Sequence, residues 1–232
     1  MSDAGDLFDQ YAAAYEEALS NALVPSGESR EYFAEGRVSW LARCLVERKQ
    51  PVGSILDFGC GDGATTPLLV HALNAKSGVG VDVSAKSLEI ARKRYAGPQI
   101  RYEAIGGFQP SGEMDLAYCN GVFHHIAPAQ RAEALAIVQR ALRTGGFFSF
   151  WENSPWSPAT RYVMSRCAFD RDAILLAPPE TRALLRDGGF EILRTDFRFI
   201  FPRALRAFRK IEDLVYRLPL GTQYQVLCRR IS

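Results

Sequence analysis

Three glycines in a short run form a turn that is suited to holding a ligand. From Asp57 to Gly63 the chain reads Asp-Phe-Gly-Cys-Gly-Asp-Gly, between an apolar segment and a predicted helix. Glycines at alternate positions permit backbone conformations that side chains block, and they let a ligand lie directly against the backbone. An ordinary connection between a strand and a helix can carry the same glycines. The run alone therefore leaves both interpretations open.

A carboxylate at the end of the next predicted strand favours ligand binding. Asp82 ends the apolar run 78–82. A carboxylate at this position can accept hydrogen bonds from both hydroxyls of a ribose. The alternative is that Asp82 only caps the helix that begins near Ser84. Together with the glycine turn upstream, Asp82 favours a nucleoside ligand.

The acidic residue before the glycines narrows the choice of nucleoside. Asp57 lies at the mouth of the first predicted strand. Its charge would repel a pyrophosphate, whereas it suits a ligand that carries an ammonium and a sulfonium group. The third glycine also comes one residue earlier than in the G-x-G-x-x-G dinucleotide fingerprint. Both features disfavour a nicotinamide-dependent oxidoreductase.

Short apolar runs that alternate with amphipathic stretches predict the elements that position these residues. Such a pattern is typical of a parallel sheet covered by helices, linked by right-handed crossovers. We therefore expect a doubly wound α/β fold. The predicted strands are 55–58, 78–82, 100–104, 115–119 and 147–151, and the predicted helices are 64–74, 84–95 and 128–143.

The two ends of the chain extend this core. Helical periodicity over 7–23 and 35–48 predicts an N-terminal helical cap, residues 1–50, ahead of a binding domain at 51–232. Insertions are expected at about 153–180 and 202–220, with a helix at 180–187 and strands at 190–201 and 223–228. The second insertion carries an apolar stripe with arginines opposite it. An ordinary helix that covers the sheet is expected there, and docking to acidic lipid or to a twin subunit is the alternative.

Composition favours a small ligand and a reducing compartment. The 28 Lys and Arg residues nearly balance 26 Asp and Glu residues, so no general field attracts nucleic acid. The five cysteines are odd in number and lack the close pairs of zinc sites or disulfide frameworks, so reduced thiols and no metal are expected. The sequence shows no signal peptide and no apolar stretch long enough to span a bilayer. We therefore expect a cytoplasmic enzyme without stable membrane insertion.

Four motifs in order resemble those of class I S-adenosylmethionine-dependent methyltransferases, in their small-molecule branch. Residues 57–63 resemble the first motif, 81–84 the ribose-binding turn, 114–126 the fourth-strand motif, and 142–147 the turn into the fifth strand. The resemblance covers roughly residues 50–152. It implies a Rossmann-like, seven-stranded, mostly parallel sheet whose antiparallel last strand is the segment near 223–228.

The resemblance also implies how S-adenosylmethionine is held. The glycine turn passes beneath its methionine part, Asp57 lies near its amino group, Asp82 binds the ribose, and Asn120 lies at the methionyl end. Many relatives place an acidic or polar residue after the third strand to meet the adenine, and this chain does not, so backbone groups near Ala104 and Ile105 take that role. The cofactor contacts expected are Asp57, Gly59, Cys60, Gly61, Gly63, Asp82, Val83, Ala104, Ile105 and Asn120.

Two adjacent histidines follow the fourth predicted strand, at the edge where open parallel sheets bind ligands. His124 or His125 could act as a general base, with His124 preferred as the residue that faces the cleft, and Glu152 could deprotonate the acceptor. The alternative is that these side chains only cap a helix or bond within the core.

Four further residues are candidates for contacts with the acceptor or for a lid. Asn153 and Trp156 follow the fifth strand, and Tyr11 and Tyr15 lie one helical turn apart. Ordinary packing and local loop hydrogen bonds are the alternatives for them.

The predicted reaction is transfer of a methyl group, by in-line displacement, to an oxygen, nitrogen or carbon atom of a small metabolite, with S-adenosylhomocysteine as the product. The rivals are an RNA-base methyltransferase, which normally shows a basic face, and a noncatalytic protein that retains the fold. Either a monomer or a homodimer is compatible with the sequence.

Overall fold

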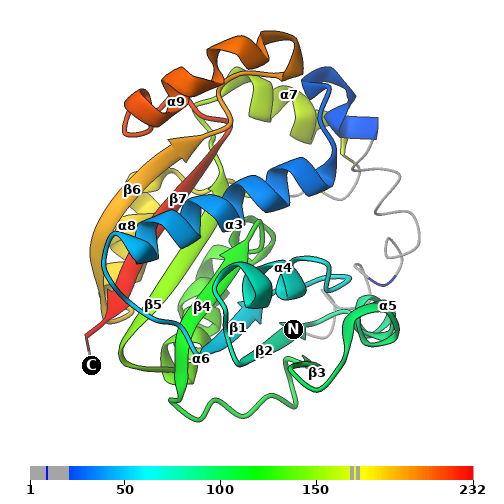
Figure 1. Ribbon diagram of the computed structural model, residues 1–232, viewed down its shortest axis with the longest axis vertical. Coiled ribbons are helices and arrows are strands. Elements are labelled where there is room, and N and C mark those ends of the chain that lie inside the picture. The colour runs from blue at the N-terminus through cyan, green and yellow to red at the C-terminus, as the bar shows by residue number, and fades with distance from the viewer. Residues whose placement is uncertain (1–8, 10–20, 168–169, 171–172, 232) are drawn as a thin grey trace.

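A seven-stranded sheet forms the centre of the computed structural model, which describes residues 9, 21–167, 170 and 173–231 (Figure 1). The strands lie in the order β3-β2-β1-β4-β5-β7-β6. Strands β1 to β5 are parallel, and β7 pairs antiparallel with both β5 and β6. Their bounds are β1 Ser54–Phe58, β2 Ser77–Asp82, β3 Ile100–Ala104, β4 Met114–Asn120, β5 Leu142–Asn153, β6 Phe190–Arg198 and β7 Gln223–Arg230. The predicted fold class, with the antiparallel strand at 223–228, is confirmed.

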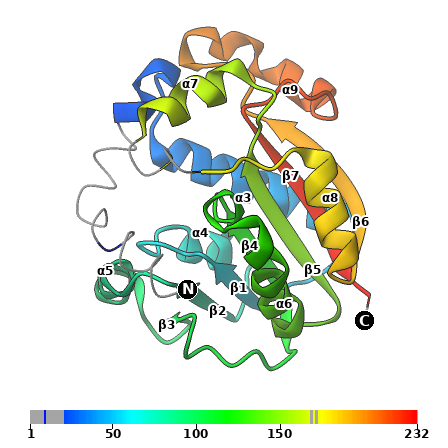
Figure 2. The same ribbon diagram turned by 180° about the vertical axis from the view of Figure 1, so that it is seen from behind.

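Helices cover both faces of the sheet because each central strand buries side chains on both sides. Leu56 of β1 belongs to one apolar core and its neighbour Ile55 to the other. Figure 1 shows α3 and α4 over one face, and Figure 2 shows α6 and α8 over the opposite face. The helices are α3 Arg30–Val46, α4 Thr65–Ala72, α5 Ala85–Tyr95, α6 Arg131–Ala141, α7 Pro158–Arg166, α8 Pro178–Asp187 and α9 Arg209–Val215. Short 3-10 turns are η1 Val24–Ser26, η2 Phe123–His125, η3 Pro128–Gln130 and η5 Arg203–Phe208.

Several predicted element bounds shift in the structure. The cap helix expected at 35–48 is α3, which starts earlier because Ser29 accepts a hydrogen bond from the amide of Tyr32. Strand β5 begins at Leu142, five residues before the predicted strand, since Leu142 pairs with Met114 across a bulge. The insertion expected after β5 contains α7, which has Ser157 as its N-cap.

The segment expected to cover the sheet at 202–220 does not bury its apolar stripe, so that expectation is wrong. Phe208, Ile211 and Leu214 are 50%, 42% and 82% exposed. The buried residue of α9 is instead Glu212, whose carboxylate accepts hydrogen bonds from the amides of Ile200 and Phe201. Those bonds hold the segment through its polar side. Within the described residues, no helix combines the length and the apolar character needed to cross a membrane.

Candidate functional site

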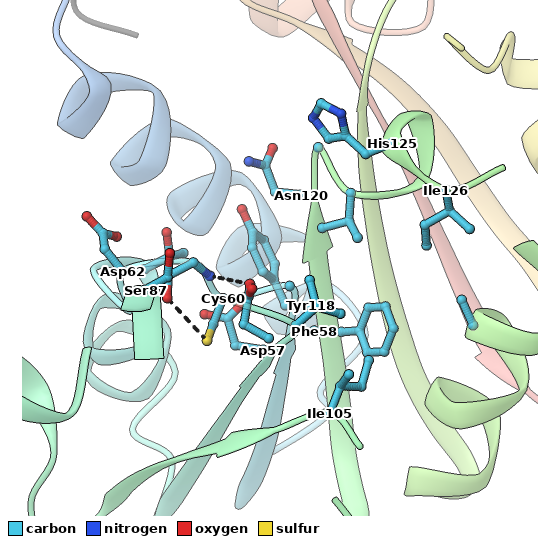
Figure 3. Close-up of a pocket in the computed structure, with 18 of the residues that line it drawn as sticks. Asp57, Phe58, Cys60, Asp62, Ser87, Ile105, Tyr118, Asn120, His125 and Ile126 are labelled. Carbon is cyan, nitrogen blue, oxygen red and sulfur yellow. Dashed lines mark hydrogen bonds between the residues drawn. The ribbon is translucent and has the colours of Figure 1, made fainter. Parts of the chain in front are cut away.

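A cavity of about 350 Å³ opens at the carboxyl ends of the central strands (Figure 3). Its walls come from the glycine turn after β1, from the end of β2, from the end of β4 with the turn that follows it, and from α3. Figure 3 shows Asn120 and His125 beyond the end of β4, and Asp57 and Cys60 beside the glycine turn. The topology brings these residues together because the ends of parallel strands meet at one edge of a sheet.

The three glycines of the turn have different physical roles. All have positive φ, at +74° for Gly59, +54° for Gly61 and +80° for Gly63. A Cβ atom at Gly59 would lie 2.2 Å from Val122, and one at Gly63 would lie 2.8 Å from Tyr102. A Cβ at Gly61 would meet nothing within 4 Å, and Gly61 lines the cavity. Packing thus requires glycine at the outer two positions, whereas Gly61 leaves a backbone surface open to a ligand.

Asp82 holds the glycine turn in place. Its Oδ2 accepts a 2.8 Å hydrogen bond from the amide of Gly61, and its Oδ1 accepts one of 2.9 Å from the amide of Ser84. Burial raises the pKa of Asp82 above its ordinary value, and the backbone amides oppose that shift. The N-cap of α5 is Ser84, whose hydroxyl accepts a hydrogen bond from the amide of Ser87, so Asp82 supports the start of that helix without being its cap. Each oxygen of Asp82 keeps lone-pair capacity for a ligand hydroxyl.

Asp57 lies on the floor of the cavity. Its carboxylate accepts a 2.7 Å hydrogen bond from the hydroxyl of Thr66 on α4. Burial raises the pKa of Asp57 to about 7, since desolvation outweighs the bond from Thr66 and nearby Asp82 adds repulsion. A cationic group in the cavity would favour the ionised form of this residue.

Helix α3 supplies a cationic wall that the sequence interpretation missed. Arg30, Ala34 and Arg37 line the cavity and recur at helical spacing on one face. The guanidinium of Arg30 lies 2.5 Å from a carboxylate oxygen of Asp62 in the glycine turn. Arg37 is buried, and its guanidinium donates a 3.1 Å hydrogen bond to the hydroxyl of Tyr118. Two arginines about two helical turns apart were the available signal, but nothing in the sequence placed α3 over this edge.

The two histidines differ from expectation in their placement. His124 is only 3% exposed and does not line the cavity, whereas His125 does. The preference for His124 as the residue that faces the cleft is therefore corrected. Nδ1 of His124 lies 2.5 Å from Glu152, whose other oxygen accepts a 2.9 Å bond from the amide of Phe123. The buried carboxylate of Glu152 draws His124 inward and ties the end of β5 to η2.

The electrostatic environments of the two rings are opposite. Burial alone would lower the pKa of His124, but the carboxylates of Glu152 and Asp170 outweigh it and raise the pKa to about 9. Burial and the neighbouring His124 lower the pKa of His125 to about 4. The histidine that borders the cavity is thus neutral near pH 7, and the one behind it is cationic.

The remaining predicted contacts divide into two groups. Cys60, Val83, Ile105 and Asn120 line the cavity. Gly63, Ala104, Glu152, Asn153 and Trp156 are not among the residues that line it.

Local interactions account for the placement of Asn153 and Trp156 in the second group. Asn153 accepts a hydrogen bond from Gln223, and Trp156 stacks on Phe197. These are the local roles that were the alternatives for both residues. Tyr11 and Tyr15, the expected lid, lie outside the described residues.

Comparisons with known proteins indicate the family of the chain. A family described as "Methyltransferase domain" matches residues 55–146. An uncharacterized methyltransferase of Synechocystis sp. is 33% identical over 154 residues, which cover 62% of this chain and 69% of that protein. A trans-aconitate 2-methyltransferase of Azoarcus sp. is 33% identical over 129 residues, 53% of this chain and 49% of that enzyme. The crystal structure of an S-adenosylmethionine-dependent methyltransferase from Mesorhizobium loti superposes with a TM-score of 0.61 at 23% identity, covering 85% of this chain and 100% of that one.

The chain therefore belongs to the class I S-adenosylmethionine-dependent methyltransferases, and S-adenosylmethionine is the cofactor of this family. The chain spans between 28% and 49% of the length of the first four curated relatives that it matches.

Proposed function

We propose that this protein transfers the methyl group of S-adenosylmethionine to a nucleophilic atom of a small molecule that carries carboxylates. The observation that carries the proposal is that one cavity joins the turn held by Asp82 to the arginine-bearing face of α3. A cofactor and an anionic acceptor can occupy such a cavity together. That the protein is cytoplasmic is part of the proposal and rests on the sequence.

The residues of the cavity fit the cofactor. The open space over Gly61 accepts a ligand against the backbone, and Asp82 offers acceptors to ribose hydroxyls. Asp57 and Asn120 border the same space and suit the amino and carboxylate ends of a methionine moiety. When bound, the cofactor supplies a methyl group already activated by its sulfonium. The chain then has to orient the acceptor and exclude water.

The acceptor class follows from the charge of the opposite wall. Arg30 and Arg37 border the cavity from α3, and guanidinium groups match carboxylates in geometry and charge. The relative from Azoarcus sp. is named for trans-aconitate, a carboxylate. A carboxylate oxygen is already deprotonated at neutral pH, so a reaction at that atom needs no general base. Methyl ester formation therefore suits a cavity whose neighbouring His124 is buried in an ion pair.

The rival functions are weaker. An RNA-base methyltransferase should present a broad basic face, whereas the chain carries a net charge of only +2. A noncatalytic protein with this fold would bind the cofactor without turnover, so only a reaction assay separates it from an enzyme.

The test measures transfer of radiolabel from methyl-labelled S-adenosylmethionine to a panel of small carboxylic acids that includes trans-aconitate. Matched amides and methyl esters of the same acids serve as controls. We expect turnover with at least one di- or tricarboxylate and none with its fully esterified form. Turnover confined to uncharged acceptors or to RNA would contradict the proposal, as would cofactor binding without transfer to any acceptor of a cell extract.

A further inference from the structure

We propose that His124, His125 and Asp170 form a binding site for a zinc-class divalent metal ion at the wall of the cavity. Nε2 of His124 and Nε2 of His125 each lie 3.5 Å from the same carboxylate oxygen of Asp170. One ligand atom from each of the three residues can be chosen so that all lie within 4.8 Å of one another. The scattered cysteines of the sequence predict no metal site, whereas the fold brings together a different set of candidate ligands.

The spacing of the ligand atoms fits an ion better than direct hydrogen bonds. A hydrogen bond between a ring nitrogen and a carboxylate is normally about 2.7–3.2 Å long. Ligand atoms about 2.0–2.1 Å from a tetrahedral ion are separated by roughly 3.4 Å. Both 3.5 Å separations match that value. Two separations among the three ligand atoms therefore match tetrahedral coordination of a common ion.

Glu152 gives the site the support that metal-binding histidines usually have. Such histidines commonly donate the ring N–H that faces away from the metal to a carboxylate, which fixes the tautomer and the ring orientation. Nδ1 of His124 lies 2.5 Å from Glu152, which leaves Nε2 directed toward Asp170. Glu152 thus serves as a positioning residue for the ligand His124, whose Nε2 releases its proton when the ion takes its place.

Backbone bonds join the segment that bears Asp170 to the turn that bears the histidines. The amide of Ile174 donates a 2.8 Å hydrogen bond to the carbonyl of His124. The guanidinium of Arg131 donates to the carbonyls of Ile174 and Phe123 at 2.7 Å and 3.1 Å. The side chain of Asp170 is only 8% exposed. The carboxylate is therefore held close to the rings in a largely desolvated position.

The donor set selects the class of ion. Two imidazoles and one carboxylate suit zinc and other first-row transition ions, whereas magnesium and calcium prefer oxygen ligands. Three protein ligands leave a fourth tetrahedral position, as in catalytic zinc sites. Of the three ligands, His125 also lines the cavity, so the proposed ion site adjoins it. Binding of the ion goes beyond the proposed function and can be measured without the cofactor.

The experiment is calorimetric titration of zinc chloride alone into full-length, chelator-treated protein that carries no polyhistidine tag. Cobalt(II) serves as a second probe, since its visible absorption reports tetrahedral coordination. We expect one ion per chain with a Kd of about 1 μM or lower. His125→Gln and Asp170→Asn should each weaken binding at least about 100-fold, and Glu152→Gln about 10- to 100-fold.

His71 provides a matched control because it is the third histidine of the chain and lies exposed on α4. His71→Gln should bind zinc as the wild type does. Binding of S-adenosylhomocysteine by each variant checks folding and separates failure of the ion site from failure of the proposed function. Absence of one-to-one binding, wild-type affinity in His125→Gln and Asp170→Asn, or loss of binding in His71→Gln would overturn the proposal.

Discussion

Oδ2 of Asp82 accepts a 2.8 Å hydrogen bond from the backbone amide of Gly61. This bond joins the end of β2 to the middle of the glycine turn after β1, and Gly61 is the glycine of that turn with open space above it. One carboxylate therefore both shapes the turn and borders the surface that a ligand would contact. Removing it should affect binding more than stability.

Asp82→Ala should weaken binding of S-adenosylhomocysteine about 10- to 150-fold, since one hydrogen bond to a charged group contributes about 1.5–3 kcal/mol. Calorimetry measures the affinity. Asp115→Ala is the matched control, because Asp115 accepts two backbone amide bonds, from Gly53 and Ser54, outside the cavity. The control should lose stability and keep its affinity. Equal losses of affinity in both variants would show that Asp82 acts only through the fold.

Substitutions at two glycines should separate binding from stability. In Gly61→Ala the added methyl group enters open space, so we expect a stability loss of about 1 kcal/mol from the positive φ and a large loss of cofactor affinity. In Gly63→Ala the methyl group collides with Ala91 and Tyr102, and overpacking should cost a further 1–3 kcal/mol or so. Chemical denaturation and calorimetry on the same samples provide both readouts. A larger loss of stability in Gly61→Ala together with a larger loss of cofactor affinity in Gly63→Ala would refute the assigned roles.

Cofactor affinity should rise with pH up to about 7. The pKa of Asp57 is raised from 3.8 to about 7, so the folded chain holds a proton in that window that the unfolded chain has released. The contribution of Asp57 to the stability of the ligand-free protein should therefore fall as pH rises from about 4 to 7, while that of His125, whose pKa is lowered to about 4, rises over much of the same window. A bound ammonium group favours ionised Asp57, so affinity for S-adenosylhomocysteine should increase, by at most about tenfold per pH unit, and level off above pH 7. In Asp57→Asn the pH dependence of affinity should disappear, and stability should rise more steeply with pH than in the wild type, because only the opposing contribution of His125 remains. Unchanged profiles would assign the effects to another group.

Arg30→Gln should raise the KM for a carboxylate acceptor about tenfold or more while affinity for S-adenosylhomocysteine changes little. The ion pair with Asp62 offers a control, since Asp62→Asn breaks the same pair but keeps the cation. Steady-state kinetics with both variants distinguishes the two roles of Arg30. If the two variants raise KM equally, Arg30 acts by holding the glycine turn and not by binding the acceptor.

Local pattern was sufficient to predict that the glycine turn and the end of the next strand would lie side by side. The buried strand before Asp57, the alternate glycines and the carboxylate at Asp82 are close in sequence, and parallel-sheet topology brings the two turns together. The other walls depend on contacts between distant segments. Whether His124 or His125 faces the cavity is decided by Glu152 on β5. Ile174, four residues beyond Asp170, donates a hydrogen bond to the carbonyl of His124 and accepts one from Arg131. Hydrophobic periodicity carries no information about such pairings.

The apolar stripe at 202–220 shows that hydrophobic periodicity can also fail to predict which side of a helix is buried. Its periodicity correctly predicts helix, yet Glu212 directs the polar side of α9 inward through the amides of Ile200 and Phe201. A single buried carboxylate thus reverses the orientation that amphipathicity favours.

Calorimetric titration of the wild-type protein with S-adenosylhomocysteine, and separately with NAD, tests the central claim most directly. We expect one-to-one binding of S-adenosylhomocysteine, weakened in Asp82→Ala and Gly61→Ala, and no binding of NAD. Binding of NAD without S-adenosylhomocysteine, or affinity for S-adenosylhomocysteine that both substitutions leave unchanged, would contradict the assignment of this cavity to the cofactor.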